Sequence, residues 1–226
     1  MRRFFSPVLA APGEQLRVGE AAAHHLLRVV GLAPGERLAL FDGQGGAVVA
    51  QLLRAEGGEA VVLVESAVDL PRPPGLRLVL GQLKGPALDA ALRMSTEQGV
   101  TEVIVVAAER SVPKGEGRLD RWERVTRAAV AQCGRADAPV LRGPMRLMDA
   151  LEAIPTEIER RICLPGAPAL GPAEGEVAVL VGPEGGWSPK EVALSVAAGC
   201  RPMSLGPWVL RADTAVVSAL ALARGG

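Results

Sequence analysis

The chain has 226 residues with 25 basic and 25 acidic side chains, so its net charge is zero and does not indicate a polyanionic partner. Hydrophobic residues make up 49% of the sequence, but Gly, Pro or charge soon interrupts every apolar stretch, which excludes a membrane span. The length allows one large or two small domains, each able to bury a core.

The N-terminal segment begins with charge and has no adequate apolar run before Pro7 and Pro12, so no secretory signal is expected. The cysteines Cys133, Cys163 and Cys200 are odd in number, widely spaced and form no CxxC pair. This spacing favours neither disulfides nor zinc. We therefore expect a cytoplasmic protein without a metal site.

The first seventy residues are predicted to form a small β-barrel or sheet. Apolar runs at 38–41, 47–53 and 60–64 alternate with glycine-rich turns. One helix is predicted over residues 20–30, where Gly31 ends the apolar pattern. Its adjacent histidines, His24 and His25, point to different sides of a helix and are not interpreted as metal ligands.

A boundary is predicted at DLPRPPG (69–75), which contains three prolines and one glycine. Such a segment forms a stiff, extended connector. We assign residues 1–70 to the β domain, residues 71–75 to a linker and residues 76–226 to a second domain.

Strands and helices alternate in the second domain. Apolar strands are predicted at 76–80, 102–107, 160–164 and 177–181, and helices at 87–98 and 118–133. This order predicts an α/β fold with a largely parallel sheet. The last helix, 214–223, is apolar almost all round, which predicts burial against the sheet or against another subunit.

Charge is segregated along the second domain. Residues 110–146 carry nine basic and four acidic side chains, whereas residues 147–192 carry three basic and eight acidic ones. A solvated helix face explains any single arginine better than a binding role does. The basic window as a whole favours a phosphate-bearing partner.

The strand at 177–181 ends in GPEGG (182–186), which must turn rather than continue the strand. Ser188, Pro189 and Glu191 then fit the N-cap, first helical position and capping-box position of a helix that stops at Gly199. A second glycine turn follows at Gly206. Two such turns predict a shared ligand, although a structural tight turn explains GPEGG equally well. The sequence contains neither the dinucleotide nor the P-loop fingerprint.

Several blocks, in order, resemble the cofactor loops of the SPOUT methyltransferases: GPEGGWSPKE (182–191), SLG (204–206) and LRADTA (210–215). Further blocks resemble the 16S ribosomal RNA uridine-N3 methyltransferase family: HHLLRVVGL (24–32), FDGQGG (41–46), STEQGV (95–100), ERSV (109–112) and QCGRAD (132–137). The resemblance implies an α/β SPOUT domain with a deep trefoil knot and a small PUA-like N-terminal β-barrel domain that helps to hold RNA. It also implies bound S-adenosylmethionine, a homodimer, and 16S rRNA as the substrate, within the 30S subunit.

The resemblance also assigns site residues. It implies that the cofactor is bound by Leu164, Gly166, Gly182, Pro183, Glu184, Gly185, Gly186, Leu205, Gly206, Leu210 and Thr214. Two departures affect the pattern: Asp213 stands where the family has Glu in LRxETA, and Pro207-Trp208 precede the position where a basic residue is common.

Methylation of uridine N3 requires a base and stabilisation of negative charge on the uracil oxygens. Glu184 and Asp213 are the candidate bases, and Arg211 and Arg135 are candidates for charge stabilisation. An alternative remains open, in which Glu184 fixes its loop and Asp213 caps the last helix. The candidate RNA contacts are Arg2, Arg3, Arg28, Arg110 and Arg135.

Two other functions remain open at this point. One is ribose 2′-O-methylation of another RNA, and the other is RNA binding without catalysis. Intact glycine loops argue against the second.

Overall fold

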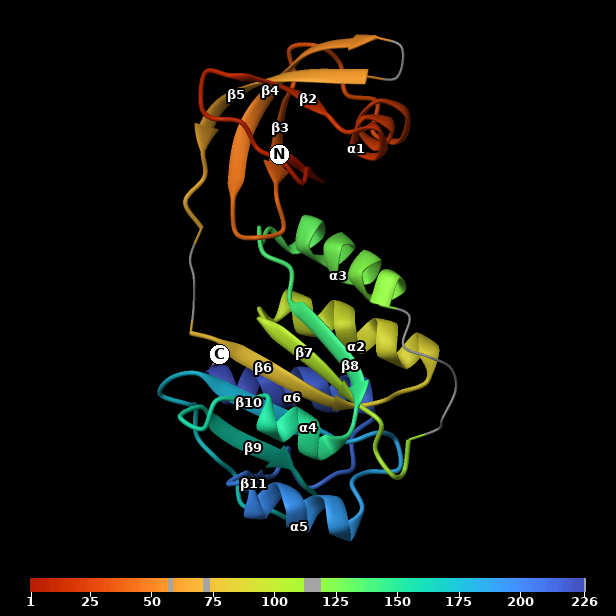
Figure 1. The fold of residues 1–226 in the computed structure, drawn as a ribbon, viewed down its shortest axis with the longest axis vertical. Coiled ribbons are helices and arrows are strands. Elements are labelled where there is room, and N and C mark those ends of the chain that lie inside the picture. Colours follow the sequence, from red (N-terminus) through yellow and green to blue (C-terminus); the bar gives the residue numbers. More distant parts are fainter. Residues whose placement is uncertain (57–58, 71–73, 112–118, 226) are drawn as a thin grey trace. The chain divides into compact units, whose positions relative to one another are not determined.

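The computed structural model describes residues 1–56, 59–70, 74–111 and 119–225. The chain divides into two compact units, one comprising Met1–Arg72 with Arg127–Ala138 and the other Pro73–Thr126 with Pro139–Gly226 (Figure 1). Residues 71–73 of the predicted linker lie outside the described residues. No helix in the described part of the chain is both long and apolar enough to cross a membrane.

The first unit contains a five-stranded sheet in the order β1-β3-β4-β5-β2. Its strands are β1 (Arg2–Phe5), β2 (Gln15–Val18), β3 (Arg37–Phe41), β4 (Ala47–Glu56) and β5 (Glu59–Ala67). The pair β1–β3 is parallel and the other pairs are antiparallel. The three predicted strands are confirmed, whereas β1 and β2 were missed because four residues containing charges give little alternating pattern.

The predicted helix of the first unit is confirmed as α1 (Glu20–His24), which continues as the π-helical turn η1 (His25–Val29). Ala23 and Leu26 are fully buried in the core of this unit. The two histidines are exposed, and the ring of His25 meets the ring of Phe4 edge-on at 5.6 Å. This edge-on geometry is a favourable ring-packing arrangement.

Residues 127–138, which the sequence pattern placed with the second domain, make their contacts within the first unit. They include the end of α3 (Leu119–Cys133). Val130 and Ala136 are buried with Phe41 and Ala47, and the guanidinium of Arg127 lies 4.9 Å from the centre of the Phe5 ring. These interactions join segments that are far apart in sequence.

The second unit contains a six-stranded parallel sheet in the order β11-β9-β10-β6-β7-β8. Its strands are β6 (Leu76–Gly81), β7 (Glu102–Val106), β8 (Val140–Met145), β9 (Glu159–Cys163), β10 (Val177–Val181) and β11 (Arg201–Met203). The predicted parallel sheet is confirmed. The strand β8 was missed because its sequence contains an internal Gly-Pro pair, which is unusual in a strand. Its side chains are only half-buried or exposed in the structure, so no apolar run marks it.

Helices cover both faces of this sheet (Figure 1). Leu78 and Leu80 of β6 face a core that includes α2 (Gly85–Glu97) and α6 (Ala212–Arg224). Val79, between them, faces the core formed with α4 (Leu147–Glu152). Alternate side chains therefore fill opposite faces, as expected for a sheet buried on both sides.

The predicted apolar face of α2 is confirmed, because Leu88, Ala91, Leu92 and Ser95 are all buried. The last helix, α6, buries one face through Val216, Ala219, Leu220 and Ala223. Its Leu222 remains 44% exposed. Within the chain, α6 is thus covered along one side only.

Candidate functional site

The glycine loop, residues 182–187, connects β10 with α5 (Pro189–Ala197). The predicted capping box is confirmed at its end: the Ser188 hydroxyl accepts the backbone N–H of Glu191 at 3.2 Å, and the Glu191 carboxylate accepts the backbone N–H of Ser188 at 2.8 Å. Gly199 follows the helix with φ of +85°. These contacts fix where the loop ends.

The glycine loop is folded tightly on its neighbours. The N–H of Gly186 donates to the carbonyl of Pro183 at 2.8 Å, and Gly186 has φ of +68°. A Cβ placed on Gly81, at the end of β6, would lie 2.5 Å from the backbone nitrogen of Pro183. A glycine at position 81 is therefore required by the close approach of two backbones.

A cavity of about 360 Å³ lies beside the glycine loop, where β9 and β10 end and the chain leaves β11. Carboxyl ends of parallel strands are the usual location of ligand sites in α/β sheets. The lining residues are Arg110, Cys163, Leu164, Pro165, Val181, Gly182, Pro183, Glu184, Gly185, Gly186, Trp187, Leu205, Gly206, Trp208, Val209, Leu210, Ala212 and Ala215. Most of the predicted cofactor residues are therefore brought together, although Gly166 and Thr214 are not part of this lining.

The candidate base Glu184 lines the cavity and is exposed. Its Oε1 lies 3.5 Å from the backbone nitrogen of Lys84, the N-cap of α2. The first backbone N–H groups of a helix have no partner within the helix and can be satisfied by such a carboxylate. This position is compatible with both roles considered for Glu184, the base and the support of the loop.

The second candidate base, Asp213, lies in the first turn of α6 and does not line the cavity. Its Oδ1 accepts the backbone N–H of Thr214 at 2.8 Å. The Arg211 side chain is 87% exposed, with its Nε 3.9 Å from the Asp213 carboxylate. Arg211 and Asp213 therefore flank Ala212, which lines the cavity, without lining it themselves.

Several apolar residues of the wall were not predicted from the sequence to be cofactor contacts. Trp187 is buried, and its indole N–H has no hydrogen-bond partner among the described residues. Trp208 and Val209 are 79% and 85% exposed. Burial raises the pKa of the Cys163 thiol to about 12, so this thiol stays protonated at neutral pH. Proximity to the glycine turns was the only signal for these positions.

The predicted RNA-contact arginines of the first unit differ in their partners. Arg2 donates to the carbonyl of Val30 at 3.0 Å, and Arg28 is exposed. Arg3 donates to the carbonyl of Arg135 at 2.7 Å, and burial lowers its pKa. Arg135 forms an ion pair with Asp137 at 2.6 Å. Arg3 therefore already contributes to holding residues 127–138 on the sheet, whereas the ion pair of Arg135 with Asp137 lies within that segment.

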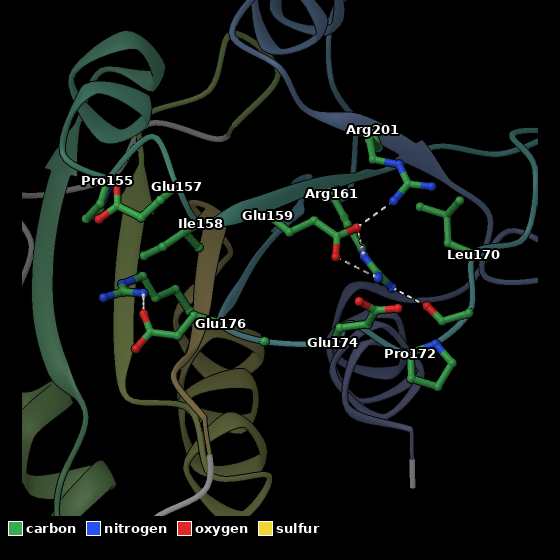
Figure 2. A pocket seen from close by; sticks show the side chains of 13 residues that line it. Pro155, Glu157, Ile158, Glu159, Arg161, Leu170, Pro172, Glu174, Glu176 and Arg201 are labelled. Atoms are coloured by element: carbon green, nitrogen blue, oxygen red, sulfur yellow. Dashed lines mark hydrogen bonds and ion pairs between the residues drawn. The ribbon is translucent and has the colours of Figure 1, made fainter.

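A second hollow, about 920 Å³ in volume, lies at the opposite edge of the same sheet, where its strands begin. Figure 2 shows Glu159 between Arg161 and Arg201. The Arg161 side chain is 2% exposed, forms an ion pair with Glu159 at 2.9 Å and donates to the carbonyl of Gly171 at 2.6 Å. Because each of its arginines, Arg77, Arg161 and Arg201, already pairs with a carboxylate, this hollow offers no free cation among its described residues and is not taken as a candidate site.

Comparison with known proteins shows which family this chain resembles. The family model described as an RNA methyltransferase domain matches residues 71–224, and the model described as an RNA methyltransferase PUA domain matches residues 18–65. A Synechocystis ribosomal RNA small subunit methyltransferase E is 33% identical, over 89% of this chain and 70% of that protein. This chain belongs to the ribosomal RNA small subunit methyltransferase E family.

Other members of the family agree over longer stretches. The Mycobacterium bovis protein of that name is 31% identical, over 96% of this chain and 88% of that protein. The crystal structure of the Neisseria gonorrhoeae enzyme bound to S-adenosylmethionine has a TM-score of 0.91 and 30% identity, covering 98% of this chain and 95% of that one. The family assignment therefore covers both units of the chain.

Proposed function

We propose that this protein transfers a methyl group from S-adenosylmethionine to N3 of a uridine in 16S rRNA. The observation that carries the proposal is the cavity beside the glycine loop, in a chain whose fold matches a family member solved with S-adenosylmethionine at a TM-score of 0.91. The N3 position comes from the resemblance of the motifs to the uridine-N3 family.

The cavity suits this cofactor. Its volume of about 360 Å³ falls in the range of small-molecule sites. Leu164, Leu205 and Leu210 would supply apolar walls for an adenine ring, and the glycines of the loop let its backbone approach the ligand closely. Gly166 and Thr214 do not line the cavity, but we keep them as proposed contacts of the cofactor.

Bound S-adenosylmethionine would supply a methyl group on a sulfonium, which is already an activated leaving group. The protein then has two tasks: to align uridine N3 with the methyl carbon, and to remove the N3 proton as the new bond forms. Glu184 is the better placed of the two candidate bases, because it lines the cavity. Asp213 and Arg211 would act from the first turn of α6 and its N-cap.

The first unit is proposed to hold the RNA, as the match to a PUA-domain model supports. Arg2 and Arg28 are exposed and suited to phosphate contact. Replacing both with Ala is expected to weaken RNA binding and to reduce its salt slope by about 0.7 to 0.9 for each phosphate that is no longer neutralised, because fewer counterions are released. An unchanged salt slope would remove them from the interface.

We also propose that the protein is a cytoplasmic homodimer that acts on rRNA within the 30S subunit. Its second unit is proposed to contain the trefoil knot of the SPOUT class. The dimer is supported by the exposed Trp208, Val209 and Leu222. A contiguous exposed apolar patch often marks an interface, and Trp208 and Val209 are adjacent in the chain. Light scattering at micromolar concentration tests the dimer, and a monomeric mass would refute it.

The decisive test incubates the protein and S-adenosylmethionine with deproteinised rRNA and, separately, with 30S subunits from a strain lacking the modification. Mass spectrometry of the digested nucleosides should detect 3-methyluridine. A 2′-O-methylated nucleoside would instead support the alternative enzyme. Absence of cofactor binding by calorimetry would support RNA binding without catalysis.

A further inference from the structure

Arg110 follows β7 and reaches the glycine loop with a single nitrogen. Its Nη1 donates to the carbonyl of Gly185 at 3.2 Å and to the carbonyl of Trp187 at 3.3 Å. These two carbonyls flank Gly186, the residue in the left-handed conformation. One guanidinium nitrogen therefore spans both sides of the turn, and its hydrogen bonds are charge-assisted.

The backbone of Arg110 also contacts the loop directly. A Cβ built on Gly185 would lie 2.9 Å from the Cβ of Arg110 and 3.1 Å from its carbonyl oxygen. Real side chains do not tolerate the shorter distance, so Gly185 lies against Arg110 only because it lacks a Cβ. The position of the loop and the position of Arg110 therefore depend on each other.

A second contact fixes the backbone just before Arg110. The N–H of Glu109 donates to Oε1 of Glu191 at 2.9 Å, while Oε2 of the same carboxylate accepts the N–H of Ser188. Glu191 is only 5% exposed, so these bonds are shielded from water. Residues 109–110 are thus attached to both the middle and the end of the glycine loop.

We infer that Arg110 is a positioning residue that holds the glycine loop in the shape that binds the cofactor, an inference that rests on the proposed function. From the sequence, Arg110 was predicted to be an RNA contact. The two roles differ in chemistry: a positioning residue needs N–H donors aimed at the two carbonyls, whereas a phosphate contact needs positive charge free for RNA.

The test compares three variants with the wild type. Arg110→Met keeps the apolar stem and removes the donors, and is expected to weaken S-adenosylmethionine binding about tenfold by calorimetry and to raise the KM for the cofactor but not for RNA. Arg110→Lys is expected to recover most of the affinity, since one ammonium nitrogen can donate to both carbonyls. Arg93→Met is the matched control, because Arg93 pairs with Glu97 on the surface of α2, away from the glycine loop.

Two further measurements separate the roles. Amide hydrogen exchange at Gly185, Gly186 and Trp187 is expected to be faster in Arg110→Met without any ligand, and the salt slope of RNA binding is expected to match the wild type. Unchanged exchange and unchanged cofactor affinity would overturn the inference. So would a salt slope reduced by about 0.7 to 0.9 with cofactor binding intact, which indicates a phosphate contact.

Failure of this inference is distinguishable from failure of the proposed function. If the wild type itself does not bind S-adenosylmethionine, the proposed function is wrong. The exchange comparison needs no ligand, so it still decides whether Arg110 holds the loop. If the wild type binds and Arg110→Met binds equally well, only the role of Arg110 is wrong.

Discussion

The backbone N–H of Glu109 donates to the carboxylate of Glu191 at 2.9 Å, across 82 positions of sequence. The same carboxylate closes the capping box of α5. One buried side chain therefore joins the segment after β7 to the helix that follows the glycine loop, and orders two walls of the candidate site together.

Replacing Glu191 with Gln should destabilise the protein. The amide offers one acceptor oxygen where the carboxylate offers two, so one backbone N–H is left without its partner at a site that is 5% exposed. The expected decrease in the free energy of unfolding is about 1–3 kcal/mol, measured by urea denaturation. The exposed Glu157→Gln is the control and should change little. Equal stability of the two variants would contradict the proposed role of Glu191.

Gly81→Ala should disturb the glycine loop, because its Cβ would lie 2.5 Å from the backbone nitrogen of Pro183. We expect about 1–3 kcal/mol lower stability and weaker cofactor binding, measured by thermal unfolding and calorimetry. Gly85→Ala is the matched control, since a Cβ there meets nothing within 4 Å. It should leave stability equal or raise it by up to about 1 kcal/mol. Equal stability and equal cofactor affinity of the two variants would contradict the requirement for glycine at position 81.

The ion pair of Arg161 and Glu159 predicts a dependence of stability on pH. Hydrogen bonding and charge from Arg161 lower the pKa of Glu159 below its usual 4.5. Since the folded pKa is the lower one, the stabilisation is present above about pH 4.5 and is lost as the pH falls through the folded pKa. Glu159→Gln should therefore be less stable than the wild type near pH 6, and the difference should shrink near pH 3. Urea denaturation at both pH values measures this difference in the free energy of unfolding. A difference that stays constant with pH would show that the ion pair does not cause it.

The thiols should differ in reactivity towards iodoacetamide. Burial raises the pKa of Cys163 to about 12 and of Cys200 to about 11, whereas Cys133 is exposed. Near pH 8, Cys163 and Cys200 stay protonated, and thiols react as thiolates. Mass spectrometry of digested protein should show Cys133 labelled first. Labelling of Cys163 at the rate of Cys133 would contradict the raised pKa of this half-buried thiol.

The sequence predicted the features that depend on local patterns. Short apolar runs located β6, β7, β9 and β10, and the capping residues Ser188 and Glu191 located the start of α5. The glycine loop was located because three glycines and a proline in five residues end a strand, and Gly186 takes the left-handed conformation. Short segments without a clear period, such as β1 and β8, gave no such signal.

Tertiary structure alone decided which distant groups meet. Nothing local in the sequence indicates that residues 127–138 pack within the first unit, or that Arg110 donates to Gly185 and Trp187. A guanidinium has several donors on a long, flexible side chain, so its partner depends on which acceptors the fold brings within reach. Residue type and spacing therefore determined the strands, the cap and the loop, whereas long-range packing determined the cavity and the partners of its charged side chains.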